Sequence, residues 1–302
     1  MSRLKAVRLL GSLSALLAVA ALAVQGEERP VVFVSIPPQA WLVKRLAGES
    51  VDVETLLAAG GNPHTFEPGA QQVKRLSDAA LYLTVGVPFE SALVSRAAKL
   101  NAKLAVAGMD AGIGKLGAPC EPEHEHRGAP EHGCACAAGG DPHIWLSPRL
   151  FCAMATNTVA ALGRAWPERR KTFEANLEGV VADIQSADRA VREAAGGVSA
   201  KTWVAYHPSW SYFARDYGLT LLVIEKDGKA PPARHLAEVI GQARAAGVKV
   251  VFSEPQYDCR PAQTVAAQIG ARLETVNPLQ EDWPALMRGL AEKLSSAGSR
   301  RP

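Results

Sequence analysis

The histidines of this 302-residue chain are the residues whose type and spacing point most directly to chemistry. His64, His143 and His207 each lie beside a proline, in a turn at or near the end of a predicted β-strand. Three of the other four histidines share one short acidic, cysteine-bearing segment: His124, His126 and His132. Imidazole is the commonest protein ligand for borderline-soft metal ions. The distribution therefore predicts a protein that binds a transition metal.

The three turns are predicted to meet in a cleft between two lobes. Ligands of parallel α/β proteins bind beyond the carboxyl ends of the strands, which is where His64 and His207 fall. His143 lies near the end of the first lobe, so that two histidines come from one lobe and one from the other. Taken singly, each has a simpler interpretation, because a histidine beside proline is more often a turn residue than a ligand.

A carboxylate is expected to complete the site. Glu281 and Asp282 follow the last predicted strand, 272–276, and either could supply an oxygen; if neither reaches the metal, water takes that place. Three nitrogens and one oxygen in a tetrahedron suit Zn²⁺, whereas Mn²⁺ prefers more oxygen ligands. Manganese and iron remain alternatives at this point. The two acids could also simply favour the N-terminus of the last helix.

Eight short β-branched or alternating runs, four in each half of the chain, predict the strands. They are 31–35, 51–57, 81–85, 103–107, 202–206, 220–224, 248–252 and 272–276. Helical patterns separate most of these runs, at 39–47, 69–79, 210–217, 233–246 and 261–269, which is typical of βαβ units with parallel sheets. We therefore expect an α/β fold with two parallel-sheet lobes, 27–147 and 199–302.

Residues 148–198 are expected to connect the lobes through helices. Ser147-Pro148 has the pattern of an N-cap followed by proline at the first helical position. A second, longer helix is predicted by an apolar stripe spaced alternately by four and three: Phe173, Leu177, Val180, Ile184, Ala187, Val191 and Ala194. From 167 to 195 such a helix is about 43 Å long. A coiled coil is the alternative, but a rigid backbone helix packed across both lobes fits the flanking α/β patterns better.

The N-terminus predicts export. Residues 1–23 combine three basic residues with an apolar run and end on Ala-Leu-Ala, the pattern of a secretory signal peptide. No cysteine follows the predicted cleavage site, so no lipid anchor is expected and the protein is predicted to be periplasmic. The whole chain has 33 basic and 30 acidic residues; without the three basic residues of 1–23 the numbers are equal. A nucleic-acid partner is therefore not expected.

The segment 117–140 contains the additional histidines and three of the five cysteines: Cys120, Cys134 and Cys136. It lacks apolar periodicity, so we expect a mobile loop without a core. Two interpretations stay open: the loop collects metal ions, or it is a solvated acidic loop. Because the cysteine count is odd, at least one cysteine is free, metal-bound or paired between chains.

The sequence resembles the periplasmic metal-binding proteins of ABC-type zinc and manganese importers, also called cluster A-I substrate-binding proteins. The resemblance covers nearly all of the chain after the signal peptide. It rests on Gly-Asn-Pro-His-Thr-Phe-Glu-Pro at 61–68, His-Ile-Trp-Leu-Ser-Pro at 143–148, Tyr-His-Pro-Ser-Trp-Ser-Tyr-Phe-Ala at 206–214, Ser-Glu-Pro-Gln at 253–256 and Asn-Pro-Leu at 277–279.

The resemblance implies that His64, His143 and His207 are ligands of a transported Zn²⁺ ion. It implies a carboxylate at Glu281 or Asp282, and an inner-membrane ABC permease as partner of a monomeric binding protein. A histidine at the third ligand position is typical of the zinc branch, while the manganese branch commonly has glutamate there. The family often has an acidic residue one or two positions before the first ligand, where this chain has Asn62 and Pro63.

A zinc-dependent hydrolase is the alternative from a different class of protein. Three histidines around a metal with one open position also describe catalytic zinc sites. The chain contains neither His-Glu-x-x-His nor Gly-x-Ser-x-Gly. The expectation is therefore a binding protein and not an enzyme.

Overall fold

The computed structural model describes residues 29–117, 140–197 and 201–298. The predicted signal peptide 1–23 and the histidine- and cysteine-bearing part of 117–140 lie outside these residues. The described residues from Val31 onward belong to one compact unit. Within the described residues, no helix is both long and apolar enough to cross a membrane.

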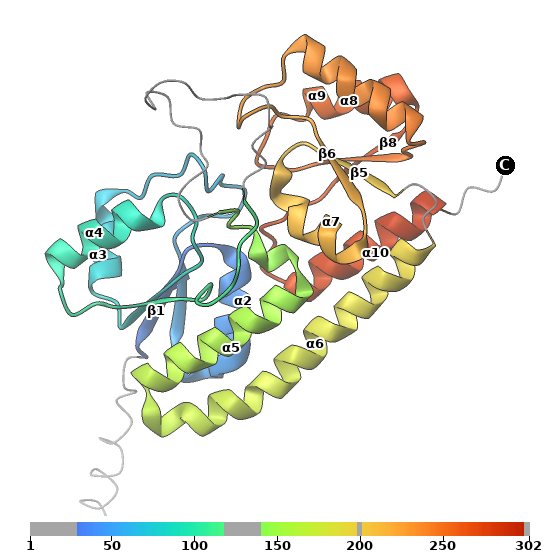
Figure 1. Cartoon of the computed structure of the whole chain (residues 1–302). Coiled ribbons are helices and arrows are strands. Elements are labelled where there is room, and N and C mark those ends of the chain that lie inside the picture. Colours follow the sequence, from blue (N-terminus) through green and yellow to red (C-terminus); the bar gives the residue numbers. More distant parts are fainter. Residues whose placement is uncertain (1–28, 118–139, 198–200, 299–302) are drawn as a thin grey trace, which may run out of the picture. The chain divides into compact units, whose positions relative to one another are not determined.

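The first lobe contains a parallel sheet of four strands in the order β2-β1-β3-β4. Its strands are β1 (Val31–Val34), β2 (Asp52–Thr55), β3 (Leu81–Thr84) and β4 (Ala105–Gly108). The helices between them are α2 (Pro37–Ala47), α3 (Ala70–Ser77) and α4 (Glu90–Leu100), with a short 3-10 turn η1 (Gly48–Ser50). Figure 1 shows α3 and α4 side by side, in agreement with their packing contacts.

The second lobe repeats this arrangement, with a parallel sheet in the order β6-β5-β7-β8. The strands are β5 (Thr202–Ala205), β6 (Thr220–Val223), β7 (Val250–Ser253) and β8 (Arg272–Thr275). The helices are α7 (Ser211–Tyr217), α8 (Ala233–Ala245) and α9 (Arg260–Ile269). Because both sheets have the same strand order, each strand of one lobe has a counterpart in the other.

All eight predicted strands are confirmed, with ends that shift by at most two residues. Parallel strands covered by helices are apolar on both faces, and β7 is an example because all four of its residues are buried. Helix α4 has no counterpart among the helices expected from the sequence. Only three of its eleven residues are buried, Glu90, Leu93 and Ala97, so its apolar pattern is weak.

The long predicted backbone helix is confirmed. Helix α5 (Pro148–Ala165) begins at Ser147, whose side chain accepts a hydrogen bond from the Leu150 N–H. After the 3-10 turn η3 (Pro167–Arg169), α6 runs from Arg170 to Gly196. Its 27 residues give a length of about 40 Å.

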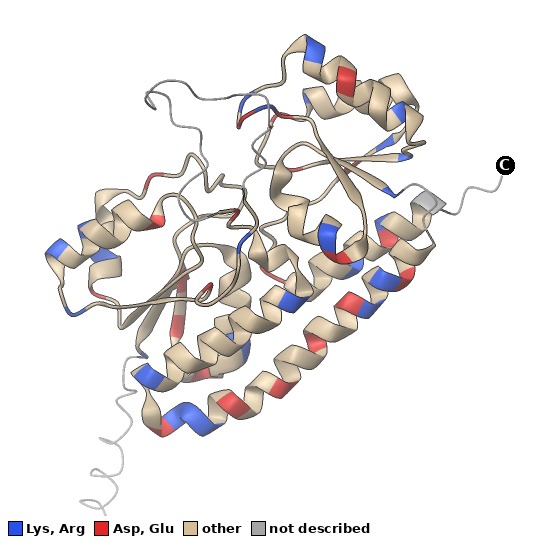
Figure 2. Cartoon of the chain, in the orientation of Figure 1, with Lys and Arg blue, Asp and Glu red and all other residues tan. Residues whose placement is uncertain are grey.

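Helix α6 packs against α2 of the first lobe, against α5, and against the C-terminal helix α10 (Trp283–Gly298). Six of the seven stripe residues on α6 are buried, and Leu177 is half-buried. Acidic and basic residues are spread along the same helix in Figure 2, as expected for a face in contact with water. The structure therefore contains one helix packed across both lobes and not a coiled coil.

Aromatic side chains join the two halves near the start of α5. The Trp145 indole N–H donates to the Pro278 carbonyl at 2.8 Å, and the Trp283 indole N–H donates to the Trp145 carbonyl at 2.6 Å. Both indoles are fully buried, so each N–H needs the acceptor that it has. This pair fixes the chain just after His143 against the segment that follows β8.

Candidate metal centre

Each of the three singled-out histidines is held by a local turn. His64 follows β2 in a turn where its backbone N–H donates to the Asn62 side-chain oxygen at 2.8 Å. His143 precedes the 3-10 helix η2 (Ile144–Leu146), and its carbonyl accepts from the Leu146 N–H. His207 comes two residues after the end of β5 and precedes the 3-10 helix η4 (Pro208–Trp210). Short turns of this kind present side chains beyond the sheet edge.

The structure brings these three histidines together. One ring nitrogen from each of them lies within 4.8 Å of the others, and no carboxylate or thiol of the described residues joins this cluster. The Nε2 atoms of His64 and His207 are 3.1 Å apart. Two ligand nitrogens on a tetrahedral zinc ion, each about 2.0–2.1 Å from it, are roughly 3.3 Å apart. The observed spacing therefore matches ligand atoms that share one small ion.

Two buried carboxylates orient the rings of His143 and His207. The Nδ1 atom of His143 lies 2.7 Å from Asp141 Oδ1, and the Nδ1 atom of His207 lies 2.8 Å from Glu225 Oε1. A carboxylate accepts hydrogen bonds, so Nδ1 carries the proton in each ring and Nε2 presents its lone pair. Metal-binding histidines almost always have such a partner, which fixes the tautomer and increases the basicity of the ligand.

The environment favours the neutral form of His64 and His207, which is the form that metal binding requires. Although part of the His64 side chain is exposed, the protein atoms around its ring shield it from water and, together with the nearby His143 and His207, lower its pKa to about 3. Burial also lowers the pKa of His207, although its hydrogen bond to Glu225 acts in the opposite direction. Burial alone would raise the pKa of Asp141, but its interactions with His143 hold that pKa below the ordinary value. Unprotonated His64 and His207 beside ionised Asp141 are consistent with cation binding.

Asp141 and Glu225 were missed as orienting residues in the sequence, although a signal for each exists. Asp141 stands two residues before His143, where a side-chain carboxylate can reach both the backbone N–H and the ring. Strand β5 pairs with β6 so that Ala205 lies opposite Val223. Continuing this register by two residues places Glu225 beside His207, and the Glu225 N–H indeed donates to the Tyr206 carbonyl.

The two carboxylates expected as a fourth ligand make other contacts in this structure. Glu281 pairs with Lys44 of α2 at 2.5 Å, with both side chains about half exposed. Asp282 accepts a hydrogen bond from the Ala285 N–H, as expected for a residue that caps the start of α10. Glu281 is therefore part of a surface ion pair, and Asp282 caps a helix.

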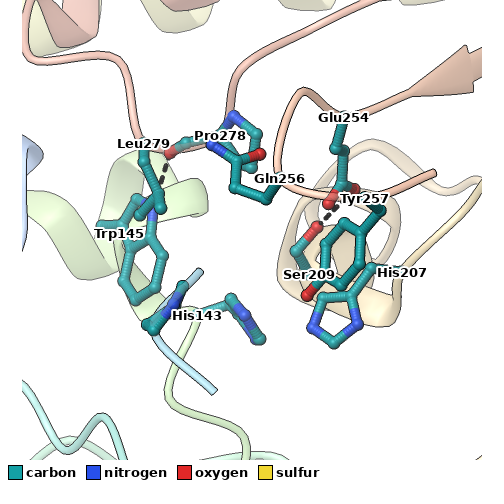
Figure 3. A pocket seen from close by; sticks show the side chains of 10 residues that line it. His143, Trp145, His207, Ser209, Glu254, Gln256, Tyr257, Pro278 and Leu279 are labelled. Atoms are coloured by element: carbon teal, nitrogen blue, oxygen red, sulfur yellow. Dashed lines mark hydrogen bonds between the residues drawn. The ribbon is translucent and has the colours of Figure 1, made fainter. Parts of the chain in front are cut away.

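A small pocket lies beside the histidine cluster and is lined mainly by the second lobe (Figure 3). Glu254 follows β7 there and accepts hydrogen bonds from the Ser209 hydroxyl and the Trp210 indole N–H, each at 2.8 Å. Burial raises the pKa of Glu254 to about 8 in spite of these bonds. Glu254 thus holds η4, the short helix that follows His207, and does not contact a histidine ring by hydrogen bonding.

Comparison with known proteins gives the family. The model of the family described as zinc-uptake complex component A, periplasmic (ZnuA), matches residues 32–297. The zinc-binding protein AdcA of Streptococcus pyogenes serotype M6 is 27% identical over 288 residues, which cover 91% of this chain and 54% of that protein. The chain therefore spans about half the length of this relative.

Two further relatives are covered over more of their length. The high-affinity zinc uptake system protein ZnuA of Bacillus subtilis is 28% identical over 246 residues, 80% of this chain and 76% of that protein. A crystal structure of a ZnuA deletion mutant with zinc bound has a TM-score of 0.80 at 32% identity, and the match covers 91% of this chain and 100% of that one. With a family match along nearly all of the described residues and the same two-lobed fold, the chain belongs to the family of the periplasmic component A of zinc-uptake complexes.

Proposed function

We propose that this protein captures Zn²⁺ outside the cytoplasm, with His64, His143 and His207 as its ligands. The observation that carries the proposal is the cluster of three imidazole nitrogens within 4.8 Å. Two of these rings have their Nδ1 atoms bonded to buried carboxylates, so their Nε2 atoms are available to a cation. The zinc-binding names of the relatives support the same ion.

Zinc is preferred over manganese and iron because of the donor set. Three nitrogens in one cluster match the tetrahedral nitrogen-rich sites of zinc, while Mn²⁺ favours carboxylate and carbonyl oxygens. With Glu281 paired to Lys44 and Asp282 bonded to Ala285, we propose water as the fourth ligand. An ion with water as its fourth ligand has one protein ligand fewer, so it is released more easily, which suits a carrier.

The captured ion is proposed to pass to an ABC-type permease in the inner membrane, in line with the resemblance to importer binding proteins and with membership of a zinc-uptake family. Residues 1–23 are proposed to direct export, and the 27–147 and 199–302 lobes to act as a monomer joined by the helices of 148–198. Chelation and release require no chemical turnover, so we propose a binding protein and not a hydrolase.

Alanine variants of the three histidines test the proposed site. His64→Ala is the sharpest of them because His64 is exposed, so that its loss opens no core cavity. We expect a large loss of zinc affinity in a competition titration against a chromophoric chelator, with an unchanged circular dichroism spectrum. His235→Ala is the matched control, since His235 lies on α8, outside the cluster, and its ring hydrogen-bonds the Val223 carbonyl. Unchanged zinc affinity in any one of the three variants removes that residue from the ligand set.

A further inference from the structure

Tyr212 is a second-lobe residue whose hydroxyl contacts the first lobe close to His143. It lies on α7, and its side chain is fully buried. The hydroxyl accepts a hydrogen bond from the Leu116 N–H at 2.8 Å and donates one to the Asp141 carbonyl at 2.7 Å. The donor and acceptor functions of this phenol are therefore both used by backbone groups of the other lobe.

The backbone of Asp141 is held from two sides. Its N–H donates to the Leu116 carbonyl at 2.7 Å, and its carbonyl accepts from Tyr212. Asp141 is 8% exposed, so these partners replace the water that would otherwise bond its N–H and C=O. One of the two contacts comes from the first lobe and the other from the second.

The side chain of Asp141 transmits this position to His143. Asp141 Oδ1 accepts the backbone N–H of His143 at 2.9 Å and lies 2.7 Å from its Nδ1. The path from the Tyr212 hydroxyl to the His143 ring therefore consists of residue Asp141 and hydrogen bonds of 2.7 to 2.9 Å. A carboxylate on so short a side chain lies where its backbone places it.

Helix α7 also follows His207 directly in the chain. The short helix η4 begins at the next residue, and α7 continues from it, so Tyr212 and His207 belong to one continuous stretch. Asp216 on the same helix accepts a hydrogen bond from the Ser147 hydroxyl, on the other side of His143. Side chains of α7 therefore hold the His143 segment at both of its ends.

We propose that Tyr212 is a positioning residue that fixes Asp141 from the second lobe and thereby sets the His143 ring relative to His207 before an ion binds. The inference rests on the proposed zinc site. The rings of the two histidines lie with centroids 5.2 Å apart, and each belongs to a different lobe. The orientation of a first-lobe ligand then depends on a second-lobe side chain, so zinc binding and this interlobe contact stabilise each other.

Tyr212→Phe tests the proposal because it keeps the buried ring and removes the hydroxyl. We expect the zinc dissociation constant to rise roughly 2- to 12-fold, the range for one hydrogen bond. The visible spectrum of the cobalt-substituted protein should change as well, since the His143 ring moves. Competition with a chromophoric chelator measures the affinity, and a dissociation constant equal to that of the wild type overturns the inference.

Tyr217→Phe is the matched control, because it makes the same chemical change on the same helix. The Tyr217 hydroxyl donates to Asp188 Oδ1 on α6 at 2.7 Å and does not contact the His143 segment by a printed hydrogen bond among the described residues. Both variants lose a buried hydrogen bond, so the melting temperature of the metal-free protein should fall in each. Zinc affinity and the cobalt spectrum should change only in Tyr212→Phe, and equal affinity losses in the two variants refute the positioning role.

A double-mutant cycle tests the path through Asp141. Asp141→Ala removes the carboxylate and keeps the carbonyl that Tyr212 contacts. In that background Tyr212→Phe should have no further effect on zinc affinity, whereas in Glu225→Ala, which alters the orientation of His207 alone, its full effect should remain. The same fold-change in the Asp141→Ala background as in the wild type contradicts the path.

Hydrogen exchange in the unmodified protein gives a test that does not depend on the folding of any variant. Because the Leu116 N–H donates to Tyr212, zinc binding should slow its exchange. The Gly247 N–H, which bonds the Arg244 carbonyl in a turn after α8, serves as the reference amide. If zinc slows the two amides equally, or slows neither, the coupling between the site and this contact is refuted.

His143→Ala separates failure of this inference from failure of the proposed site. If His143→Ala keeps wild-type zinc affinity, the site itself is misassigned and the role of Tyr212 fails with it. If His143→Ala loses zinc while Tyr212→Phe binds it with wild-type affinity, the site stands and only the role of Tyr212 is refuted.

Discussion

Replacement of Glu225 tests whether its hydrogen bond orients the metal-binding nitrogen of His207. Glu225 Oε1 lies 2.8 Å from His207 Nδ1, and both side chains are less than a tenth exposed. In Glu225→Ala the Nδ1–H is left buried without its acceptor, and the imidazole is free to place its proton on Nε2 instead. That tautomer has no lone pair for the ion at the position nearest His64.

The expected loss can be estimated from this geometry. Removing the hydrogen-bond partner of a metal-binding histidine typically weakens metal binding by about 10- to 100-fold. This corresponds to about 1.4–2.8 kcal/mol, since each tenfold change in affinity is about 1.4 kcal/mol. In Glu225→Gln the amide oxygen can still accept the Nδ1–H, so orientation persists and only the negative charge is lost. We therefore expect Glu225→Gln to lose less than Glu225→Ala.

Competition with a chromophoric chelator measures both affinities, and circular dichroism shows whether each variant is folded. Glu238→Ala is the matched control, because Glu238 is an exposed residue of α8 that pairs with Arg234. Zinc affinity equal to wild type in folded Glu225→Ala refutes the orienting role. Equal losses in Glu225→Ala and Glu238→Ala also refute it, because a distant surface charge would then explain both.

Three further outcomes are expected. The metal-free protein should lose stability as the pH falls below 6.5, because His64 has a lowered folded pKa of about 3 and the unfolded chain therefore binds more protons in that window. His64→Ala should weaken this decline in melting temperature, and a melting temperature that rises on acidification contradicts the reasoning. Zinc at a thousandfold excess over its dissociation constant should add about 4 kcal/mol to the free energy of unfolding, so an unchanged melting temperature argues against binding between the lobes. Deletion of 120–136 should leave one tight site and remove weaker zinc-binding sites. The rest of the fold should tolerate the deletion, because Leu116 and Asp141 on either side of it are already joined by a 2.7 Å hydrogen bond. Calorimetry that finds the same total zinc stoichiometry before and after deletion contradicts metal binding by that segment.

Several features of the fold could be predicted from the sequence because they depend on local patterns. The central strands β1, β5 and β7 are largely apolar and buried, so their runs are visible without knowledge of their neighbours. The stripe of α6 repeats at helical spacing, and Ser147-Pro148 marks the start of α5 through capping chemistry. Helix α4 lacked such a signal because it buries few residues.

The sequence by itself also determined which histidines stand at strand ends, since turn residues and strand runs are adjacent in the chain. It did not determine their distances, because His64 and His207 are 143 residues apart and meet only when the lobes pack across α6. The proximity of Glu281 and Asp282 to the last strand suggested a fourth ligand, but their side chains are directed by Lys44 and by the start of α10. Proximity in sequence determines where a segment lies, whereas the direction of a side chain depends on the contacts available to it.

The partners of the histidines were likewise decided by tertiary structure. Glu225 reaches His207 through the register between β5 and β6, and the Tyr257 ring, from the segment after β7, stacks on His207. Such contacts are non-local, and each depends on strand pairing or lobe packing that no short stretch of sequence encodes. Residue type and local spacing therefore specified the ligand candidates, and the packing of two separately encoded sheets specified the site.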